Sequence, residues 1–294
     1  MTKFNSKLGV SIVNFNSGEF LSKCLGSLDN VKEEVDLEIF VVDNASSDNS
    51  LELARKQFPK INYIEMEENL GFGRANNIAL EKIKCEFILI LNPDTEIEKG
   101  VLGKMVLFLE KNPEVGAVSC RVLLENGSLD WASHRGFPTP LAAFLYYFLG
   151  DDSLYHLTKK PMNELHEVDA ISGAFFLTRK SVLDKVGEFD EDFFMYAEDI
   201  DLCFRIKQEG FKVMYVPEVS IVHHKGISSG LKKHSENVTT ATIETRIRSV
   251  DAFYESMKIF YKKHLEKNYP TIINWLVYFG IYTKWWLAKR SMHV

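Results

Sequence analysis

Short apolar runs alternate with helical patterns along the first 120 residues. Stripes of apolar residues at helical spacing occupy residues 20–28 and 75–83. The runs themselves are nearly continuous in apolar residues, which is typical of strands buried on both faces of a parallel sheet. They are residues 8–15, 37–43, 61–66, 86–92 and 115–120. The alternation predicts an α/β fold with a doubly wound, mostly parallel central sheet that is flanked by helices. Its ligands are expected at the carboxyl ends of the strands.

The alternation becomes irregular after residue 120. Residues 141–150 are apolar but far too few to span a bilayer. A strand is predicted at 168–178, a helix at 199–209 and a further strand at 211–217. The chain contains neither internal repeats nor low-complexity linkers. These patterns predict one compact domain over residues 1–237, followed by a helical tail over residues 238–294.

The tail combines a predicted long helix at 238–265 with a strongly apolar segment at 271–290. Tryptophans and basic residues flank or interrupt the second segment, and Lys284 lies within it. This composition favours a helix that lies in the membrane interface. The alternatives are a helix that packs in the core or in a homodimer, and a true membrane span, which requires about 20 apolar residues.

Charge is unevenly distributed between the body and the tail. The net charge is −6, and residues 258–294 hold seven Lys or Arg against the single acid Glu266, so the tail segment carries +6 and the remainder −12. The acidic body argues against a nucleic-acid partner, and the basic tail indicates an anionic membrane surface. The four cysteines lack metal-ligand spacing, and the first residues lack the pattern of a signal peptide. We therefore expect a cytoplasmic protein with reduced thiols.

Polar residues that can bind a nucleotide follow three of the predicted strands. Asp43 ends the second run, where a carboxylate can accept hydrogen bonds from a base or a ribose. Gly71 permits close backbone approach in the segment NLGFGRANN, in which Arg74 can meet a phosphate and Asn77 a nucleoside or sugar. Asp94 follows the fourth run and suits a hard divalent cation that holds a diphosphate. Turn formation and helix capping are the plain alternatives for Asp43 and Asp94.

An acidic cluster and a histidine pair complete the candidate chemistry. Glu198, Asp199 and Asp201 stand at a predicted helix start, where one of them can act as a general base. Favourable interaction of acids with the helix dipole is the alternative explanation. His223 and His224 precede a Gly/Ser segment and can supply a metal ligand or a diphosphate contact.

The order of these motifs resembles that of family 2 glycosyltransferases, in particular the rhamnosyltransferase-like branch. The resemblance covers roughly residues 8–230 and rests on VSIVNFN, VVDNASSDNS, NLGFGRANN, LNPDT, the EDIDLC cluster and the H-H-x-G-x-S segment. It implies a GT-A fold, a nucleotide-diphosphate sugar donor and inversion at the anomeric carbon.

The resemblance also implies roles for individual residues. Asp43 matches the base-recognition carboxylate and Asp199 the catalytic base. Asp94 matches the last acid of the D-x-D motif, with Asn92 at its first position, and His223 matches a further metal ligand. Donor contacts are expected from Asn14, Asn16, Asp43, Gly71, Arg74, Asn77 and Asn92, and acceptor contacts from Gly173, Ala174, Glu198 and Asp201.

Taken together, these features predict an inverting, metal-dependent glycosyltransferase. Residues 1–120 form the half that binds the nucleotide sugar and residues 121–237 the acceptor half. We expect Mn²⁺ or Mg²⁺ as the metal. The resemblance to the rhamnosyltransferase-like branch implies dTDP-rhamnose as the first candidate donor, ahead of UDP-hexoses. The expected acceptor is a glycan or lipid-linked hydroxyl in cell-surface polysaccharide synthesis. The enzyme is expected at the inner face of the plasma membrane as a peripheral protein.

Two other functions remain open at this point. A sugar nucleotidyltransferase needs a basic, glycine-rich loop after its first strand, and residues 11–20 contain neither Lys nor Arg. A non-catalytic scaffold that only binds a nucleotide sugar does not need the acidic cluster, which this chain retains.

Overall fold

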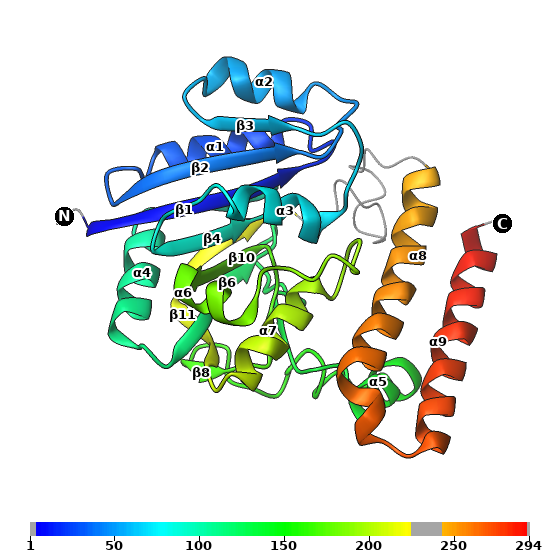
Figure 1. The fold of residues 1–294 in the computed structure, drawn as a ribbon. Coiled ribbons are helices and arrows are strands. Elements are labelled where there is room, and N and C mark those ends of the chain that lie inside the picture. The colour runs from blue at the N-terminus through cyan, green and yellow to red at the C-terminus, as the bar shows by residue number, and fades with distance from the viewer. Residues whose placement is uncertain (1–3, 225–242, 293–294) are drawn as a thin grey trace.

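The computed structural model describes residues 4–224 and 243–292, in which a nine-stranded mixed sheet forms the centre of the molecule (Figure 1). The sheet has the order β3-β2-β1-β4-β10-β6-β11-β5, with β8 paired to β11. Its strands are β1 (Phe4–Asn14), β2 (Val35–Asp43), β3 (Asn62–Glu65), β4 (Phe87–Leu91), β5 (Thr95–Ile97), β6 (Val115–Leu123), β8 (His166–Glu167), β10 (Phe175–Arg179) and β11 (Lys212–His223). A separate pair is formed by β7 (His134–Arg135) and β9 (Ala170–Ile171).

Strand direction confirms the predicted mostly parallel sheet. Strands β1, β2, β3 and β4 pair in parallel, and so do β6 and β11. Strand β10 runs antiparallel to both of its neighbours, β4 and β6. The carboxyl ends of β1, β2 and β4 therefore meet at one edge, which points toward the C-terminal helices (Figure 1).

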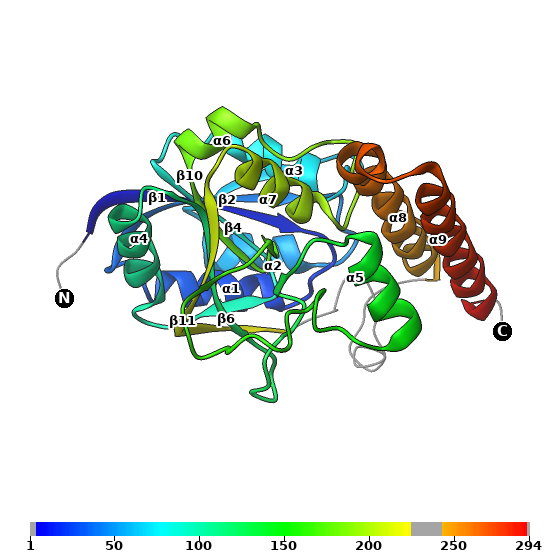
Figure 2. The ribbon, with the colours of Figure 1, turned by 90° about the horizontal axis from the view of Figure 1, so that it is seen from below.

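Helices cover both faces of the sheet because its strands are apolar on both sides. Along β4, Phe87, Leu89 and Leu91 face one core cluster, whereas Ile88 and Ile90 face the other. The first cluster is closed by α1 (Phe20–Asp29), α2 (Ser50–Gln57) and α4 (Val101–Lys111), and the second by α3 (Phe72–Leu80), α6 (Lys180–Val186) and α7 (Glu198–Gln208). Figure 2 shows α3, α6 and α7 together on one side of the sheet.

The strand predicted at 168–178 is interrupted in the structure. It divides into β9 and β10 at residues 172–174. A side chain at Gly173 is excluded sterically, because a Cβ there would lie 2.7 Å from Cζ of Phe72. The interruption leaves Gly173 and Ala174 on the wall of a cavity rather than in a sheet ladder.

The tail forms a helical hairpin at one end of the molecule (Figures 1 and 2). Helix α8 (Ile243–Phe260) continues through a π-helical turn, η3 (Tyr261–Leu265), and a 3₁₀ turn, η4 (Glu266–Asn268), into α9 (Thr271–Met292). Phe260, Tyr261 and Leu265 are buried in the core cluster that also contains α7. The tail is thus joined to the body through this turn, while the predicted boundary at residue 237 and the start of the predicted helix at 238 lie outside the described residues.

Helix α9 keeps a broad apolar surface exposed. Trp275, Phe279 and Trp286 are each more than half exposed, at 63%, 58% and 57%. None of the helices in the described ranges combines the length and the apolarity that crossing a bilayer requires.

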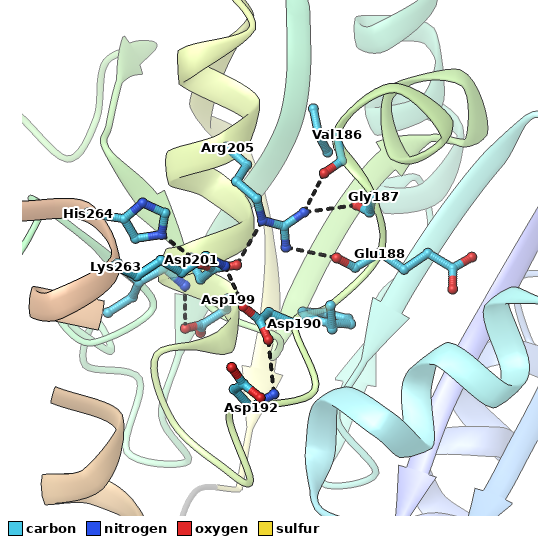
Figure 3. A network of polar contacts seen from close by, with 12 residues as sticks. Val186, Gly187, Glu188, Asp190, Asp192, Asp199, Asp201, Arg205, Lys263 and His264 are labelled. Carbon is cyan, nitrogen blue, oxygen red and sulfur yellow. Dashed lines mark hydrogen bonds and ion pairs between the residues drawn. The ribbon is translucent and has the colours of Figure 1, made fainter. Parts of the chain in front are cut away.

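A buried carboxylate, Asp201 on α7, joins the body to the tail (Figure 3). Its Oδ2 accepts a hydrogen bond from Nε of Arg205 at 2.8 Å. Its Oδ1 accepts one from Nζ of Lys263 at 2.7 Å and lies 2.6 Å from Nε2 of His264. Burial alone would raise the pKa of Asp201, but the hydrogen bond from His264 and the charge of Arg205 lower it to about 2.

We predict that Asp201→Asn destabilises the fold by about 2 kcal/mol or more at pH 7, because Arg205 and Lys263 lose their shared anion. Since the folded pKa of Asp201 is below its ordinary value, its stabilisation is complete above pH ~4 and is lost as the pH falls toward 2. Urea unfolding between pH 7 and pH 3 should therefore show the difference from the wild type shrinking with acidity. The control Asp184→Asn, in an exposed pair with Lys180, should cost less than about 0.5 kcal/mol. An equal loss for Asp201→Asn at every pH would contradict this explanation.

Candidate active site

A cavity of about 1240 Å³ lies at the carboxyl ends of the parallel strands. Segments that follow β1, β2 and β4 line it, and so do the start of α7 and the end of β11. Eight of the predicted site residues line this cavity: Gly71, Asn92, Asp94, Gly173, Ala174, Glu198, Asp199 and His223.

Asp94 and His223 form an ion pair in the cavity wall. Oδ1 of Asp94 lies 3.1 Å from Nε2 of His223, and the other ring nitrogen lies 3.4 Å from Oδ2 of Asp130. Burial opposes the charge on both partners, but each charge favours the other. The pKa of His223 is consequently raised to about 9, and the pKa of Asp94 lies below its ordinary value.

The chemistry of this pair suits part of a metal site. Within residues 4–224 and 243–292, groups of three or more His, Cys, Asp and Glu side chains with metal-binding geometry are absent. Asp94 and His223 supply one oxygen and one nitrogen ligand, so the remaining ligands of a divalent ion have to come from a bound diphosphate and water. The ion has to displace the proton from His223, because only a neutral imidazole binds metal.

The start of α7 presents two carboxyl groups to the same cavity, the buried Glu198 and the partly buried Asp199. Oδ1 of Asp199 accepts a hydrogen bond from the backbone N–H of Ile200 at 2.8 Å, and the backbone of Gly173 also bonds to Asp199. Burial, followed by the charge of Asp199, raises the pKa of Glu198 to about 8. Glu198 is therefore mostly protonated at neutral pH, and the pKa of Asp199 also lies above its ordinary value, chiefly because of burial.

Arg135 favours the ionised form of Asp199, although no sequence motif distinguishes it. It lines the cavity, and its Nη1 donates to the hydroxyl of Tyr155 at 3.2 Å. Burial raises the pKa of Asp199, and the charge of Arg135 counteracts this effect. Asp130 was missed as well. Asp130 lies in the irregular segment after β6 and Arg135 in the two-residue strand β7, where neither periodicity nor a recognised motif distinguishes them.

Three of the residues expected to contact the donor, Asn14, Asn16 and Asp43, form hydrogen bonds within the protein. Nδ2 of Asn14 donates to Oδ1 of Asp43 at 2.6 Å and to the hydroxyl of Ser50 at 2.9 Å. Oδ1 of Asn16 accepts from the backbone N–H of Ser47 at 2.7 Å. These bonds fix the loop after β2 to the end of β1. Asn14, Asn16 and Asp43 lie beside the cavity rather than on its wall, so their contact with the donor, and that of Asp43 with its base, remains a prediction.

Gly71 allows the chain to pass closely against the loop that precedes α7. Its φ is +86°, and a Cβ there would lie 2.1 Å from the carbonyl oxygen of Phe194. Asn77 exchanges two hydrogen bonds with the backbone of Phe189, and the exposed Arg74 pairs with Glu191 at 3.0 Å. Arg74 and Asn77 are therefore occupied in packing α3 against this loop and lie outside the cavity wall.

Asp201 also departs from its predicted place. It was expected to shape the acceptor site beside Glu198 and Asp199, but it points away from the cavity into the contacts with Arg205, Lys263 and His264 (Figure 3). The reason is helical geometry, because a residue two positions after Asp199 lies on another side of α7. Its role in this structure is to join α7 to the tail.

Comparison with known proteins agrees with this arrangement. The model of the Glycosyl transferase family 2 matches residues 10–187. The N-acetylglucosaminyl-diphospho-decaprenol L-rhamnosyltransferase of Mycobacterium tuberculosis is 27% identical over 241 residues, which cover 76% of this chain and 78% of the relative. The rhamnosyltransferase WbbL of Escherichia coli K12 is 30% identical over 225 residues, which cover 73% of this chain and 82% of the relative.

Solved structures share the fold at low sequence identity. A mannosyltransferase from Pyrobaculum calidifontis superimposes with a TM-score of 0.58 at 20% identity, over 88% of this chain and 65% of that protein. TarS of S. aureus gives a TM-score of 0.55 at 18% identity, over 87% of this chain and 43% of that protein. With a mixed sheet of this order, a cavity at its strand ends and a family match across more than half of its length, this chain belongs to glycosyl transferase family 2 and is a glycosyltransferase of the GT-A fold.

Proposed function

We propose that this enzyme transfers a sugar, with inversion, from a nucleotide-diphosphate sugar to an acceptor hydroxyl. The observation that carries the proposal is that Asp199 lines the same cavity as the Asp94–His223 pair. A carboxylate of this kind can accept the proton of an attacking hydroxyl, and a diphosphate leaving group needs compensation of its charge.

The reaction is a single displacement. The acceptor oxygen forms a bond to the anomeric carbon while the bond from that carbon to the diphosphate oxygen breaks. The hydroxyl proton passes to Asp199, and the electron pair leaves with the nucleoside diphosphate. Arg135 favours the ionised form of Asp199 before attack, and the protonated Glu198 keeps a second negative charge away from the reacting centre.

We propose Mn²⁺ or Mg²⁺ as the metal, held by Asp94 and His223. A divalent ion at this place neutralises negative charge on the departing diphosphate. A mixed oxygen and nitrogen pair suits Mn²⁺ somewhat better than Mg²⁺. Support comes from the mannosyltransferase of P. calidifontis, which was crystallised with GDP-Man and Mn²⁺.

The relatives support a particular donor and acceptor. Two of them are named as rhamnosyltransferases, and the mycobacterial relative is named for a sugar carried on a decaprenyl diphosphate. We therefore propose dTDP-rhamnose as the first candidate donor, with UDP-hexoses next. The proposed acceptor is a glycan, free or linked to a lipid, in cell-surface polysaccharide synthesis.

We further propose that α9 holds the enzyme on the inner face of the plasma membrane. Trp275, Phe279 and Trp286 provide exposed apolar and aromatic surface, and the exposed Lys262 and Lys267 lie in the turn that leads to it. Aromatic rings beside basic side chains suit the interface of an anionic bilayer. The same surface can also pair with a second copy of the chain, which is the competing explanation.

We predict that Asp199→Asn lowers turnover by about 10²-fold or more, because general-base catalysis contributes roughly 10²–10⁴. The assay measures release of nucleoside diphosphate from dTDP-rhamnose and UDP-hexoses with a prenyl-diphosphate N-acetylglucosamine acceptor. Asp192→Asn is the matched control, since this exposed carboxylate precedes the same helix but lies outside the cavity. Near-normal turnover by Asp199→Asn would refute its role.

The same assay on the wild type separates the alternative functions. Binding of nucleotide sugar without turnover would favour a scaffold, and consumption of nucleoside triphosphate would favour a nucleotidyltransferase.

The membrane proposal predicts that Trp275→Ser combined with Trp286→Ser reduces partitioning onto anionic vesicles at least tenfold, as measured by sedimentation. The control Trp131→Ser changes a tryptophan that is 38% exposed on the body of the protein and should leave partitioning unchanged. If the wild type ignores vesicles and the double change instead converts a dimer into a monomer by light scattering, α9 is a dimer surface.

A further inference from the structure

The cavity is larger than one small ligand requires. Ligand pockets commonly have volumes of about 300–1,000 Å³, whereas this cavity has about 1240 Å³. The additional space extends away from Asp199, between the helical turn after β7 and the C-terminal hairpin. We call this extension the tail groove and define it by the residues of α5, η1, α8 and α9 that line the cavity.

Apolar side chains form the walls of the tail groove. One wall consists of α5 (Pro140–Phe144) and the π-helical turn η1 (Leu145–Leu149), and the other consists of α9. Residues of α8 line the groove as well. Figure 2 shows α5 beside the hairpin of α8 and α9. The apolar residues that line the groove include Leu141, Phe144, Phe148, Met257, Leu276 and Ile281.

Contacts between the walls show that they belong to one groove. Nζ of Lys284 on α9 donates to the carbonyl oxygen of Tyr147 at 3.3 Å and lies 5.4 Å from the ring centre of Phe148. Gly280 faces the same ring, since a Cβ at this position would lie 4.0 Å from Cζ of Phe148. Gly280 on α9 therefore faces Phe148 on η1 without a side chain between them.

The inner end of the groove is cationic. Arg135 bonds to the hydroxyl of Tyr155, and its charge acts on both Asp199 and Tyr147. Its Nε is buried without a hydrogen-bond partner among the described residues. Arg135 therefore lies between the carboxylate of Asp199 and the apolar groove, and its Nε–H can still donate a hydrogen bond to a ligand. The outer end continues into the exposed apolar surface of α9 and η1, where Leu276 and Phe148 are 51% and 59% exposed.

We propose that the tail groove binds the hydrocarbon chain of a lipid-diphosphate-linked acceptor, with the phosphate beside Arg135 and the sugar hydroxyl at Asp199. Along the cavity, the carboxylate of Asp199 is followed by the cation of Arg135 and then by the apolar tail groove. This order matches that of sugar, diphosphate and hydrocarbon in such a molecule. The proposal rests on the proposed glycosyl transfer and selects a lipid-linked acceptor over a free glycan. The groove walls α8 and α9 lie beyond residue 187, where the family match ends.

The test measures binding of dimethylallyl, geranyl and farnesyl diphosphate by titration calorimetry in EDTA, which keeps the diphosphate from a metal-dependent donor site. Each methylene that enters the groove is worth about a fourfold gain in affinity, so farnesyl diphosphate should bind at least tenfold more tightly than dimethylallyl diphosphate. Gly280→Trp fills the groove and should remove this gain. Ser291→Trp adds the same side chain to an exposed position of α9 outside the cavity and should preserve it.

Three outcomes would overturn the proposal. The first is an affinity for prenyl diphosphates that is independent of chain length, and the second is an unchanged gain in affinity with chain length in Gly280→Trp. The third is competition for the groove by dihexanoyl phosphatidylglycerol that is as strong as that by farnesyl diphosphate, which would assign the groove to bulk lipid. If Gly280→Trp does not fold by circular dichroism, Phe148→Ser on the opposite wall takes its place, with a smaller gain expected. Metal-dependent binding of nucleotide sugars, measured on the same proteins, separates the two proposals, because its absence from the wild type counts against glycosyl transfer and not against the groove.

Discussion

The architecture of the site depends on opposing effects on the pKa of one carboxylate, that of Asp199. Asp199 stands at the first turn of α7, away from bulk water, where burial favours its protonated form. Arg135, the backbone N–H of Ile200 and the backbone of Gly173 favour the ionised form. The pKa of the neighbouring Glu198 is raised to about 8, because Glu198 is buried and lies next to Asp199. We propose the carboxylate of Asp199 as the base that takes the proton of the acceptor hydroxyl.

The C-terminal hairpin is part of this site as well as a surface element. Asp201, two residues after Asp199, accepts hydrogen bonds from η3 in the turn between α8 and α9, so α7 and the tail are held together by one cluster (Figure 3). The hairpin also forms one side of the tail groove. Positions of the base, the groove and the exposed apolar surface are consequently fixed relative to each other.

Sequence predicted the parts of the molecule that repeat a period or match a motif. The parallel strands are continuous apolar runs, and Asp94, Asp199 and His223 belong to ordered motifs, so the fold and the wall of the cavity could be predicted. The place of Arg135 could not be predicted, because it lies in the two-residue strand β7. The position of β7 depends on pairing with β9, which lies 35 residues further along the chain. The direction of Asp201 depends on packing against the tail, and the break at Gly173 depends on the distant ring of Phe72.

We propose that Asp94 and His223 hold a metal that joins the donor to the cavity of Asp199. The most direct measurement is a thermal-shift panel of UDP-, dTDP- and GDP-sugars, with and without Mn²⁺, on the wild type and on Asp94→Ala. The account predicts a metal-dependent shift for one nucleotide in the wild type that is lost in the variant. A shift that needs no metal, or one of equal size in Asp94→Ala, would contradict it.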